Sequence, residues 1–267
     1  MVHLTRNMPC IVAAVLLAAI LLPGCVKNPY TGRSQFIIMS ESEEMRLGLE
    51  YTRQLLEELE IETGTRRALR VERVGRRIAA VAERPNFDWQ FHTVVSEQVN
   101  AFVLPGGRVF FYTGILELIG DNEDELAAIM GHEIAHAVAR HAAERMSQNM
   151  VSSTVLNVAS QVVGGVTGSS FASQAVQTGG GLVARLGVLL PYSRRHELEA
   201  DHIGVILAAK AGYDPRAALS FWDKMAAQSK GREPLGILST HPLTAERKEN
   251  LHRIMPEALR HYRPRTP

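Results

Sequence analysis

The segment HEIAH, residues 132–136, places two histidines and a glutamate within a stretch of small and apolar residues. Asn122 and Glu125 form an N-terminal capping pattern, so the segment is expected deep inside a helix that begins there. Two unpaired imidazoles are costly to bury in such surroundings, whereas a bound metal ion would satisfy them. The chain is therefore expected to fold so that the interior of one helix forms the wall of a polar site.

The spacing within this segment predicts a zinc site. His132 and His136 are four residues apart, so about 40° separates them around a helix and both rings can reach one ion. Glu133 lies at the edge of the same face, where it can accept a proton from a water that zinc acidifies. We expect one zinc ion per chain, with Glu133 as general acid/base. Two core histidines on a buried helix are the alternative interpretation.

A third protein ligand is expected in HELEAD, residues 196–201. Glu197 and Asp201 share one helix face, whereas Glu199 lies about 200° from Glu197. We expect Glu197 to bind zinc, and Asp201 to orient the free N–H of a ligating histidine. The alternative is a solvated acidic helix face.

His141, the third histidine near the motif, is predicted to be a bystander. The pattern H-E-x-x-H-x-x-G-x-x-H would require glycine at position 139 and histidine at position 142, and this chain has alanine at both. Helical geometry also places His141 about 140° from His136 and about 180° from His132. Both arguments place its ring away from the metal.

The rest of the chain predicts an α+β fold that is mostly helical. Apolar periodicity and capping patterns predict helices over residues 40–62 and 65–83, from 122, from 193, and over 212–228. Three β-rich segments separated by turns predict a small antiparallel sheet beside the motif helix, at residues 89–95, 100–104 and 108–114. Residues 146–184 carry no charge and contain repeated glycines. That composition is compatible with a helical hairpin and linker or with a mobile lid.

The N-terminus has the composition of a secretory signal. An apolar run of twelve residues at 11–22 follows Arg6, and a run of that length is too short for a helix that spans a bilayer. It ends in LPGC, residues 22–25, which resembles a bacterial lipobox. We expect cleavage before Cys25 and lipidation of its thiol, which would hold the chain on a membrane surface. An ordinary signal peptide with an incidental cysteine is the alternative.

Charge composition excludes one class of partner. The chain has 29 Lys and Arg against 28 Asp and Glu, so no overall field favours nucleic acid. We therefore expect no nucleic-acid partner.

Five short motifs occur in one order, and together they identify a family resemblance. They are NAFVLPGG at 100–107, HEIAH at 132–136, SRRHELEAD at 193–201, AGYDP at 211–215 and STHP at 239–242. With this order and spacing the chain resembles the HtpX-like and CAAX-prenyl-protease-like gluzincin metallopeptidases, especially their lipoprotein and periplasmic members. The resemblance implies a zincin-like fold and peptide hydrolysis. It assigns the metal and acid/base roles to the positions chosen above.

The resemblance also implies further site residues. It implies that one segment is an active-site edge strand, along which an extended substrate could add as a further strand. The residues of this segment are Asn100, Ala101, Phe102, Val103 and Leu104. Arg194 could hydrogen-bond the oxyanion, or could instead pair with a nearby carboxylate. His241 could be a removable fourth zinc ligand or contact substrate, or could instead be an ordinary loop or cap residue.

The resemblance and the expected compartment together imply a zinc endopeptidase of the bacterial envelope that hydrolyses misfolded or misassembled envelope proteins. The expected organisation is a signal at 1–24, lipidated cysteine and tether at 25–39, a metalloprotease domain at 40–260 and a tail at 261–267. By resemblance to enterobacterial lipoprotein sorting, Val26 in place of aspartate after Cys25 favours an outer-membrane anchor facing the periplasm. The alternative function is a periplasmic assembly chaperone that uses the same groove with little proteolysis.

Overall fold

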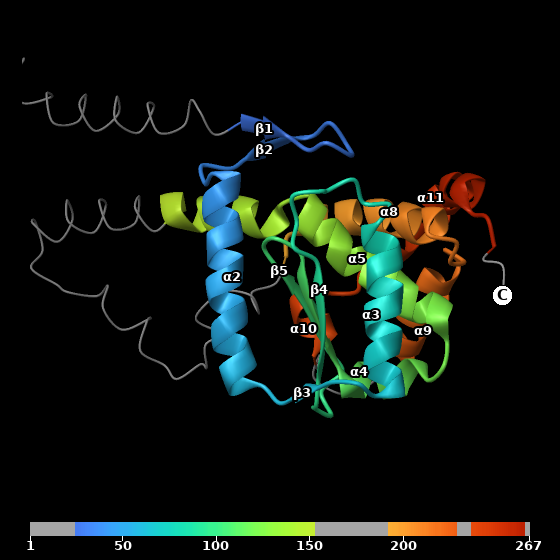
Figure 1. Cartoon of the computed structure of the whole chain (residues 1–267). Coiled ribbons are helices and arrows are strands. Elements are labelled where there is room, and N and C mark those ends of the chain that lie inside the picture. The colour runs from blue at the N-terminus through green and yellow to red at the C-terminus, as the bar shows by residue number, and fades with distance from the viewer. Residues whose placement is uncertain (1–24, 153–191, 229–235, 265–267) are drawn as a thin grey trace, which may run out of the picture.

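The computed structural model describes residues 25–152, 192–228 and 236–264. A four-stranded mixed sheet lies between a single long helix on one face and a group of helices on the other (Figure 1). The strands, in their order across the sheet, are β3 (Ile61–Glu62), β4 (Gln90–Val94), β6 (Arg108–Tyr112) and β5 (Ala101–Leu104). The sheet thus ends at β5.

Alternation along the strands divides the side chains between two hydrophobic cores. Ala101 and Val103 face the larger core with α3 (Arg66–Ala79), α4 (Thr113–Ile119) and α5 (Glu123–Val138). Phe102 and Leu104 face the smaller core, where Leu55 of α2 (Glu41–Glu58) covers the sheet. This two-residue period is the pattern expected of a sheet covered on both faces.

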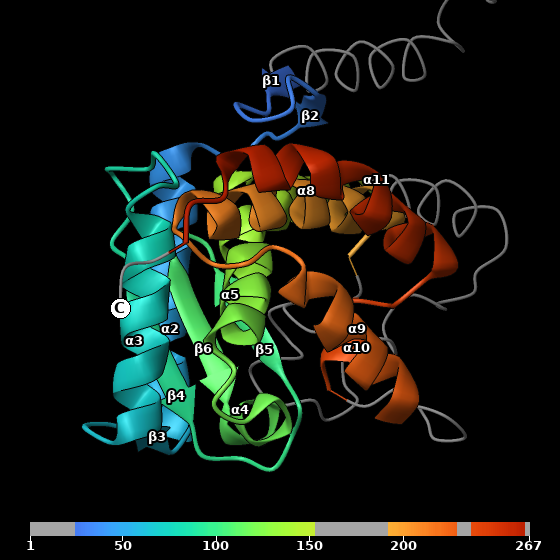
Figure 2. The same cartoon turned by 90° about the vertical axis from the view of Figure 1, so that its right-hand side faces the viewer.

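Four further helices of the described chain pack beyond α5 and complete the larger core. They are α8 (Arg194–Lys210), α9 (Ala217–Gln228), α10 (Ile237–Thr240) and α11 (Ala245–His261). Figure 2 shows α8 and α11 lying together across one end of the molecule. Side-chain caps set where the long helices begin, because Ser40, Asn122, Ser193 and Thr244 each accept a backbone N–H of the first turn.

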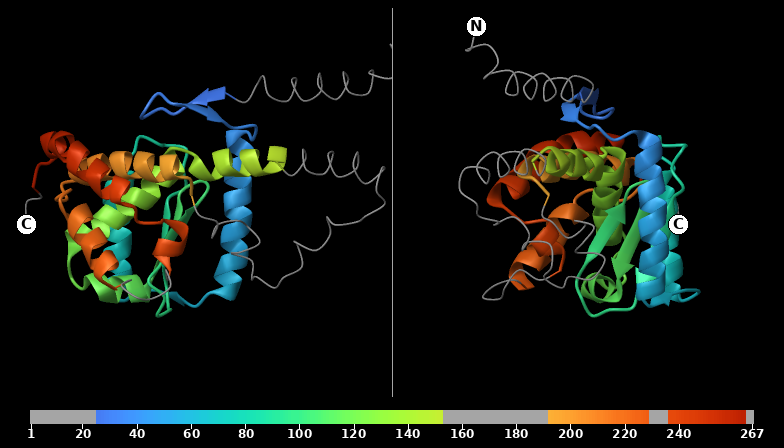
Figure 3. Two further views of the ribbon diagram at one scale, coloured as in Figure 1. Left: turned by 180° about the vertical axis from the view of Figure 1, so that it is seen from behind. Right: turned by 90° about the vertical axis from the view of Figure 1, so that its left-hand side faces the viewer.

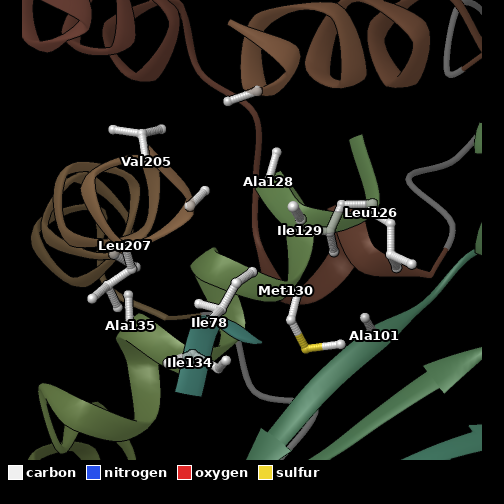
Figure 4. Packing of buried hydrophobic residues seen from close by; sticks show 14 of the residues in the cluster. Ile78, Ala101, Leu126, Ala128, Ile129, Met130, Ile134, Ala135, Val205 and Leu207 are labelled. Atoms are coloured by element: carbon white, nitrogen blue, oxygen red, sulfur yellow. The ribbon is translucent and has the colours of Figure 1, made fainter. Parts of the chain in front are cut away.

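Helices α5 and α8 approach each other closely where two glycines meet. A Cβ on Gly204 would lie 2.8 Å from the backbone nitrogen of His132, and a Cβ on Gly131 would lie 2.6 Å from the carbonyl oxygen of Gly204. Around this crossing the helices bury Ile134, Ala135 and Leu207, and Met130 points from α5 toward Ala101 of β5 (Figure 4). The crossing holds the motif helix at a fixed distance from α8.

Gly204→Ala is expected to destabilise the protein by about 1–3 kcal/mol, because the added methyl overpacks the helix crossing. Intrinsic helix propensity alone predicts the opposite, a gain of about 1 kcal/mol. Denaturant unfolding of Gly204→Ala would be compared with that of Lys210→Ala, a change at an exposed position of the same helix. A Gly204→Ala protein at least as stable as the wild type would show that the helices can separate at no cost.

Residues 25–36, predicted as part of a tether, are folded. They form a hairpin of β1 (Cys25–Lys27) and β2 (Ser34–Phe36), which lies over the end of the molecule where α8 runs (Figure 3). Gln35 is buried and donates a hydrogen bond to the carbonyl oxygen of Ala139. The polar composition of this segment reflects hydrogen bonds to the domain, so the tether prediction is wrong for these residues.

The α+β, mostly helical fold class is confirmed. The sheet differs in one detail, because β6 inserts between β4 and β5 and pairs in parallel with β4. Among the described residues, the helices are too short or too polar to cross a bilayer. The predictions for residues 1–24, and for 153–184 of the uncharged segment, lie outside the described residues.

Candidate metal centre

Three parts of the fold bring their side chains to one buried point. Helix α5 supplies His132 and His136, α8 supplies Glu197 from its first turn, and His241 caps the C-terminal end of α10. Because Ser193 caps α8, the helix starts at Arg194, three residues before Glu197, and directs that carboxylate toward α5. These four residues are buried and form a group that could hold a metal ion.

The ligand atoms of this group face one another at short range. His132 Nε2 lies 3.1 Å from His136 Nε2 and 3.2 Å from His241 Nδ1. Glu197 Oε1 lies 3.4 Å from His136 Nε2 and 3.0 Å from His241 Nδ1. At zinc–nitrogen distances of 2.0–2.1 Å, the ligand atoms of a tetrahedral site are separated by about 3.3 Å. The spacing therefore fits a single zinc ion.

The electrostatics of the group also fit a cation. Burial lowers the pKa of His136, which keeps its ring neutral as a metal ligand must be. Burial would also lower the pKa of His132, but Asp201 and Glu197 outweigh it and raise that pKa to about 9. The two carboxylates thus supply negative charge that a divalent ion would neutralise.

Glu133 lies beside the ligand group without joining it. Its side chain is fully buried, and its Oε1 is 3.6 Å from His241 Nε2. Neither carboxylate oxygen has a hydrogen-bond partner among the described residues. Burial, the largest influence, raises the pKa of Glu133. A buried carboxylate with a raised pKa and free lone pairs is suited to accept and return a proton.

Asp201 lies where it can orient His132 and is itself held by a buried arginine. Its Oδ1 is 3.0 Å from His132 Nδ1. Arg247 of α11 donates to Asp201 from Nε at 2.8 Å and from Nη2 at 2.7 Å, and its Nη1 lies 2.9 Å from Glu197 Oε2. The guanidinium also stacks over Trp222, 4.3 Å from the ring centre. Arg247 thus contacts both the candidate ligand Glu197 and Asp201, the carboxylate that orients the candidate ligand His132.

The prediction that His141 is a bystander is wrong. Its Nδ1 lies 2.9 Å from His136 Nδ1, and its Nε2 lies 3.0 Å from Glu199 Oε2. Helix α5 ends at Val138, and Arg140 has a positive φ of 55°. A second helical segment then covers residues 141–152 of the described chain. This break resets the helical phase, so angles counted from a continuous helix do not apply to His141.

Arg194 and the predicted substrate strand lie near the centre. Arg194 is exposed, its side chain makes no hydrogen bond or ion pair with another described residue, and it lines a cavity of about 260 Å³ together with Glu197 and Arg247. The segment 100–104 includes β5, the last strand of the sheet, and β5 packs against α5. Both features are therefore on the elements that frame the ligand group.

Sequence reasoning missed two neighbours of the ligand group, Arg247 and Tyr192. Tyr192 stacks on His136 with ring centres 4.0 Å apart. Both residues are distant in sequence from the motif helix, and neither has a spacing pattern that connects it with the histidines. The packing of α11 against α8, and of α8 against α5, brings Arg247 to the site, and Tyr192 lies just before the start of α8.

Comparison with known proteins agrees with this geometry. The pattern of peptidase family M48 matches residues 65–255. The chain is 38% identical over 194 residues to the mitochondrial metalloendopeptidase OMA1 of Schizosaccharomyces pombe, covering 71% of this chain and 53% of that protein. It is 34% identical over 248 residues to the human mitochondrial metalloendopeptidase OMA1, covering 87% and 46%. It is 29% identical over 227 residues to the beta-barrel assembly-enhancing protease of Escherichia coli, covering 82% and 45%.

The chain spans about half the length of these three relatives. The family match nevertheless covers most of the chain and includes the histidines of α5, the glutamate of α8 and His241. It confirms the resemblance found in the motifs. The chain belongs to peptidase family M48.

Proposed function

We propose that the chain is a zinc-dependent endopeptidase that cleaves misfolded or misassembled proteins of the bacterial envelope. One observation carries the proposal, namely the buried convergence of His132, His136 and Glu197, with the unpartnered carboxylate of Glu133 beside them. Two histidines and one glutamate are a known ligand set for catalytic zinc. When bound, zinc supplies Lewis-acid chemistry that acidifies a water molecule and polarises the scissile carbonyl.

Residues of the chain itself would carry out proton transfer, ligand orientation and stabilisation of the oxyanion. Glu133 accepts the proton of the attacking water and returns it to the amine nitrogen as the peptide bond breaks. Asp201 holds the orientation of His132 through its ring nitrogen. Arg194 lies at an exposed position beside Glu197, where it can contact the oxyanion that develops on the substrate. Water is the nucleophile in this scheme, so no acyl-enzyme forms.

Strand β5 offers a place for an extended substrate. Tyr112 N donates to Asn100 O, and the register continues with Phe102 opposite Phe110. Alternate residues of an antiparallel strand point their backbone groups in opposite directions. Ala101 and Val103 therefore direct theirs away from β6, toward an edge that no described strand pairs with. An unfolded segment could add there as a further strand.

His241 favours a second candidate function, an assembly chaperone with little proteolysis. Its Nδ1 completes a group of four protein ligands, with His132, His136 and Glu197. Closed four-ligand zinc sites are structural, whereas catalytic sites keep one position open. Proteolysis therefore requires His241 to move away, and a chain in which it stays would hold clients without cleaving them.

For location we propose the envelope side of a bacterial membrane, with a lipid anchor at Cys25. The lipobox-like sequence at residues 22–25 supports this proposal, as does similarity to a protease named for β-barrel assembly in Escherichia coli. The OMA1 relatives are named as mitochondrial. The proposal is tested by metabolic labelling of the wild type and Cys25→Ala with a radioactive fatty acid, and equal labelling would contradict it.

The metal assignment predicts different outcomes for two glutamates of α8. Glu197→Ala should lose zinc, because it removes a ligand, and should lose cleavage of an unfolded protein with it. Glu199→Ala should still bind one zinc ion per chain, although with lower affinity, since its carboxylate is not a ligand and reaches the ligand group only through His141. Zinc content after dialysis and cleavage of casein, with and without a chelator, measure both. Zinc lost from Glu199→Ala but kept by Glu197→Ala would reverse the assignment.

A further inference from the structure

We propose that Arg33 and His141 are positioning residues of the metal centre, and that the N-terminal hairpin completes that centre. The proposal rests on the proposed function, because it concerns the ligand His136. It is drawn from a continuous series of contacts that runs from the hairpin of residues 25–36, through Glu199 and His141, to the ring of His136. The outer end of this series is a residue that follows Cys25 by only eight positions.

The inner part of the series fixes the ring of His136. His136 Nε2 faces the other ligand atoms, so its second nitrogen, Nδ1, is free to bond elsewhere. That nitrogen lies 2.9 Å from His141 Nδ1, and His141 Nε2 lies 3.0 Å from Glu199 Oε2. Because Glu199 only accepts hydrogen bonds, His141 donates from Nε2 and accepts from His136 at Nδ1. Such partners orient a ligating imidazole and increase its basicity.

The outer part of the series fixes Glu199. Arg33 donates to Glu199 Oε2 from Nε at 2.9 Å and from Nη2 at 2.7 Å, and Thr31 donates to Oε1. Arg33 also donates to both oxygens of Glu144, at 2.8 and 2.6 Å. Only 17% of the Arg33 side chain is exposed, and both carboxylates are buried. Without this guanidinium, the buried carboxylates of Glu144 and Glu199 would lose the positive charge that pairs with both of them, which is costly in a buried site.

The two candidate histidine ligands are thus supported in different ways. His132 has a carboxylate beside it directly, with Asp201 at 3.0 Å. His136 reaches its carboxylate through one intervening imidazole, and that carboxylate depends on the hairpin. Docking of residues 25–36 therefore affects the orientation of His136 and not that of His132. An N-terminal segment that left the domain would release Glu199 and loosen the ring of His136.

The test measures zinc affinity of the full chain by competition with a chelator. His141→Leu is expected to weaken zinc binding about 10- to 100-fold, and Arg33→Gln about 10-fold, the range known for partners of zinc ligands. The same variants, loaded with Co²⁺, should show a shifted visible absorption spectrum, since the geometry at His136 changes. His141→Asn keeps an acceptor near the position of Nδ1 and should recover most of the affinity, and Arg33→Lys should recover part.

Two matched controls separate positioning from general destabilisation. His202 of α8 pairs with Glu257 at 3.1 Å on the surface, and Arg70 is a buried arginine paired with Asp121 at 3.1 Å. His202→Asn and Arg70→Gln should bind zinc with wild-type affinity, whatever their stability without metal. Wild-type zinc affinity and an unchanged Co²⁺ spectrum in His141→Leu and Arg33→Gln would overturn the proposal.

Failure of the underlying metal site would give a different result. His132→Ala, measured in the same series, removes a candidate ligand outright and should lose tight zinc binding. If His132→Ala binds zinc like the wild type, the metal centre itself is misassigned and the proposed function fails with it. If only His132→Ala loses zinc, the metal centre stands and the series through His141 is wrong.

Discussion

Replacing Glu133 by glutamine will reduce cleavage of an unfolded protein at least about 100-fold while leaving zinc bound, because general acid-base catalysis contributes about 10²–10⁴. Glutamine keeps the size of the side chain but cannot take a proton from water. Glu133 is not among the four residues whose atoms converge, so its replacement should not release the metal. The measurement is kcat/KM for casein cleavage, together with zinc content of the same sample.

Glu50→Gln provides the matched control for this prediction, because Glu50 is half-exposed and forms only a surface pair with Arg46. It should retain wild-type activity. Equal activity of the Glu133→Gln and wild-type proteins would refute the mechanism. Zinc binding by the wild type without any cleavage would instead favour the chaperone function.

The part of the site that lies within single helices could be predicted from the sequence. The phase of an uninterrupted helix relates His132 to His136, and relates Glu197 to Asp201, and the structure brings these side chains together. The capping pattern at Asn122 also places the start of α5 correctly, and the helix start predicted near residue 193 is confirmed. Local periodicity is sufficient here because no break separates the residues in each pair.

The wrong prediction for His141 has a specific physical cause. The angular argument assumed one helix through residue 141, whereas the left-handed backbone of Arg140 separates two helices. Glycine or asparagine usually occupies such a position, so arginine gave no indication of a break. The ion pair between Arg140 and Glu44 of α2, with Nε 2.6 Å from Oε2, helps hold this conformation. It joins residues almost a hundred positions apart, which no local pattern identifies.

The tether prediction for the hairpin is wrong for a similar reason, because local sequence does not identify distant partners. Proline, glycine and polar residues in a short segment are typical of loops. Arg33 and Gln35 are polar because their partners are buried carboxylates and a backbone carbonyl of the domain. The sequence reports that these side chains require hydrogen bonds, but only the tertiary structure shows that the domain, and not water, supplies them.

Arg247→Met is expected to lower the free energy of unfolding of the metal-free protein by about 3–5 kcal/mol, the cost of removing one partner of a buried ion pair. The change leaves the carboxylates of Asp201 and Glu197 buried with less positive charge near them, and it removes the stacking on Trp222. Methionine fills similar volume, so the loss would come mainly from uncompensated charge and not from a cavity. Denaturant unfolding with chelator present measures the effect.

Two comparisons make the test of Arg247 decisive. Arg216→Met removes an exposed arginine that pairs with Asp214, and it should leave the free energy of unfolding nearly unchanged. Adding Asp201→Asn to Arg247→Met should recover part of the loss, because it removes one of the two uncompensated carboxylates. If Arg247→Met unfolds like Arg216→Met, the charge of Arg247 is not what holds these carboxylates. The expected loss would mean that Arg247 of α11 stabilises both the candidate ligand Glu197 and Asp201, the carboxylate beside His132. Folding of the C-terminal helix and assembly of the metal centre would then be one process.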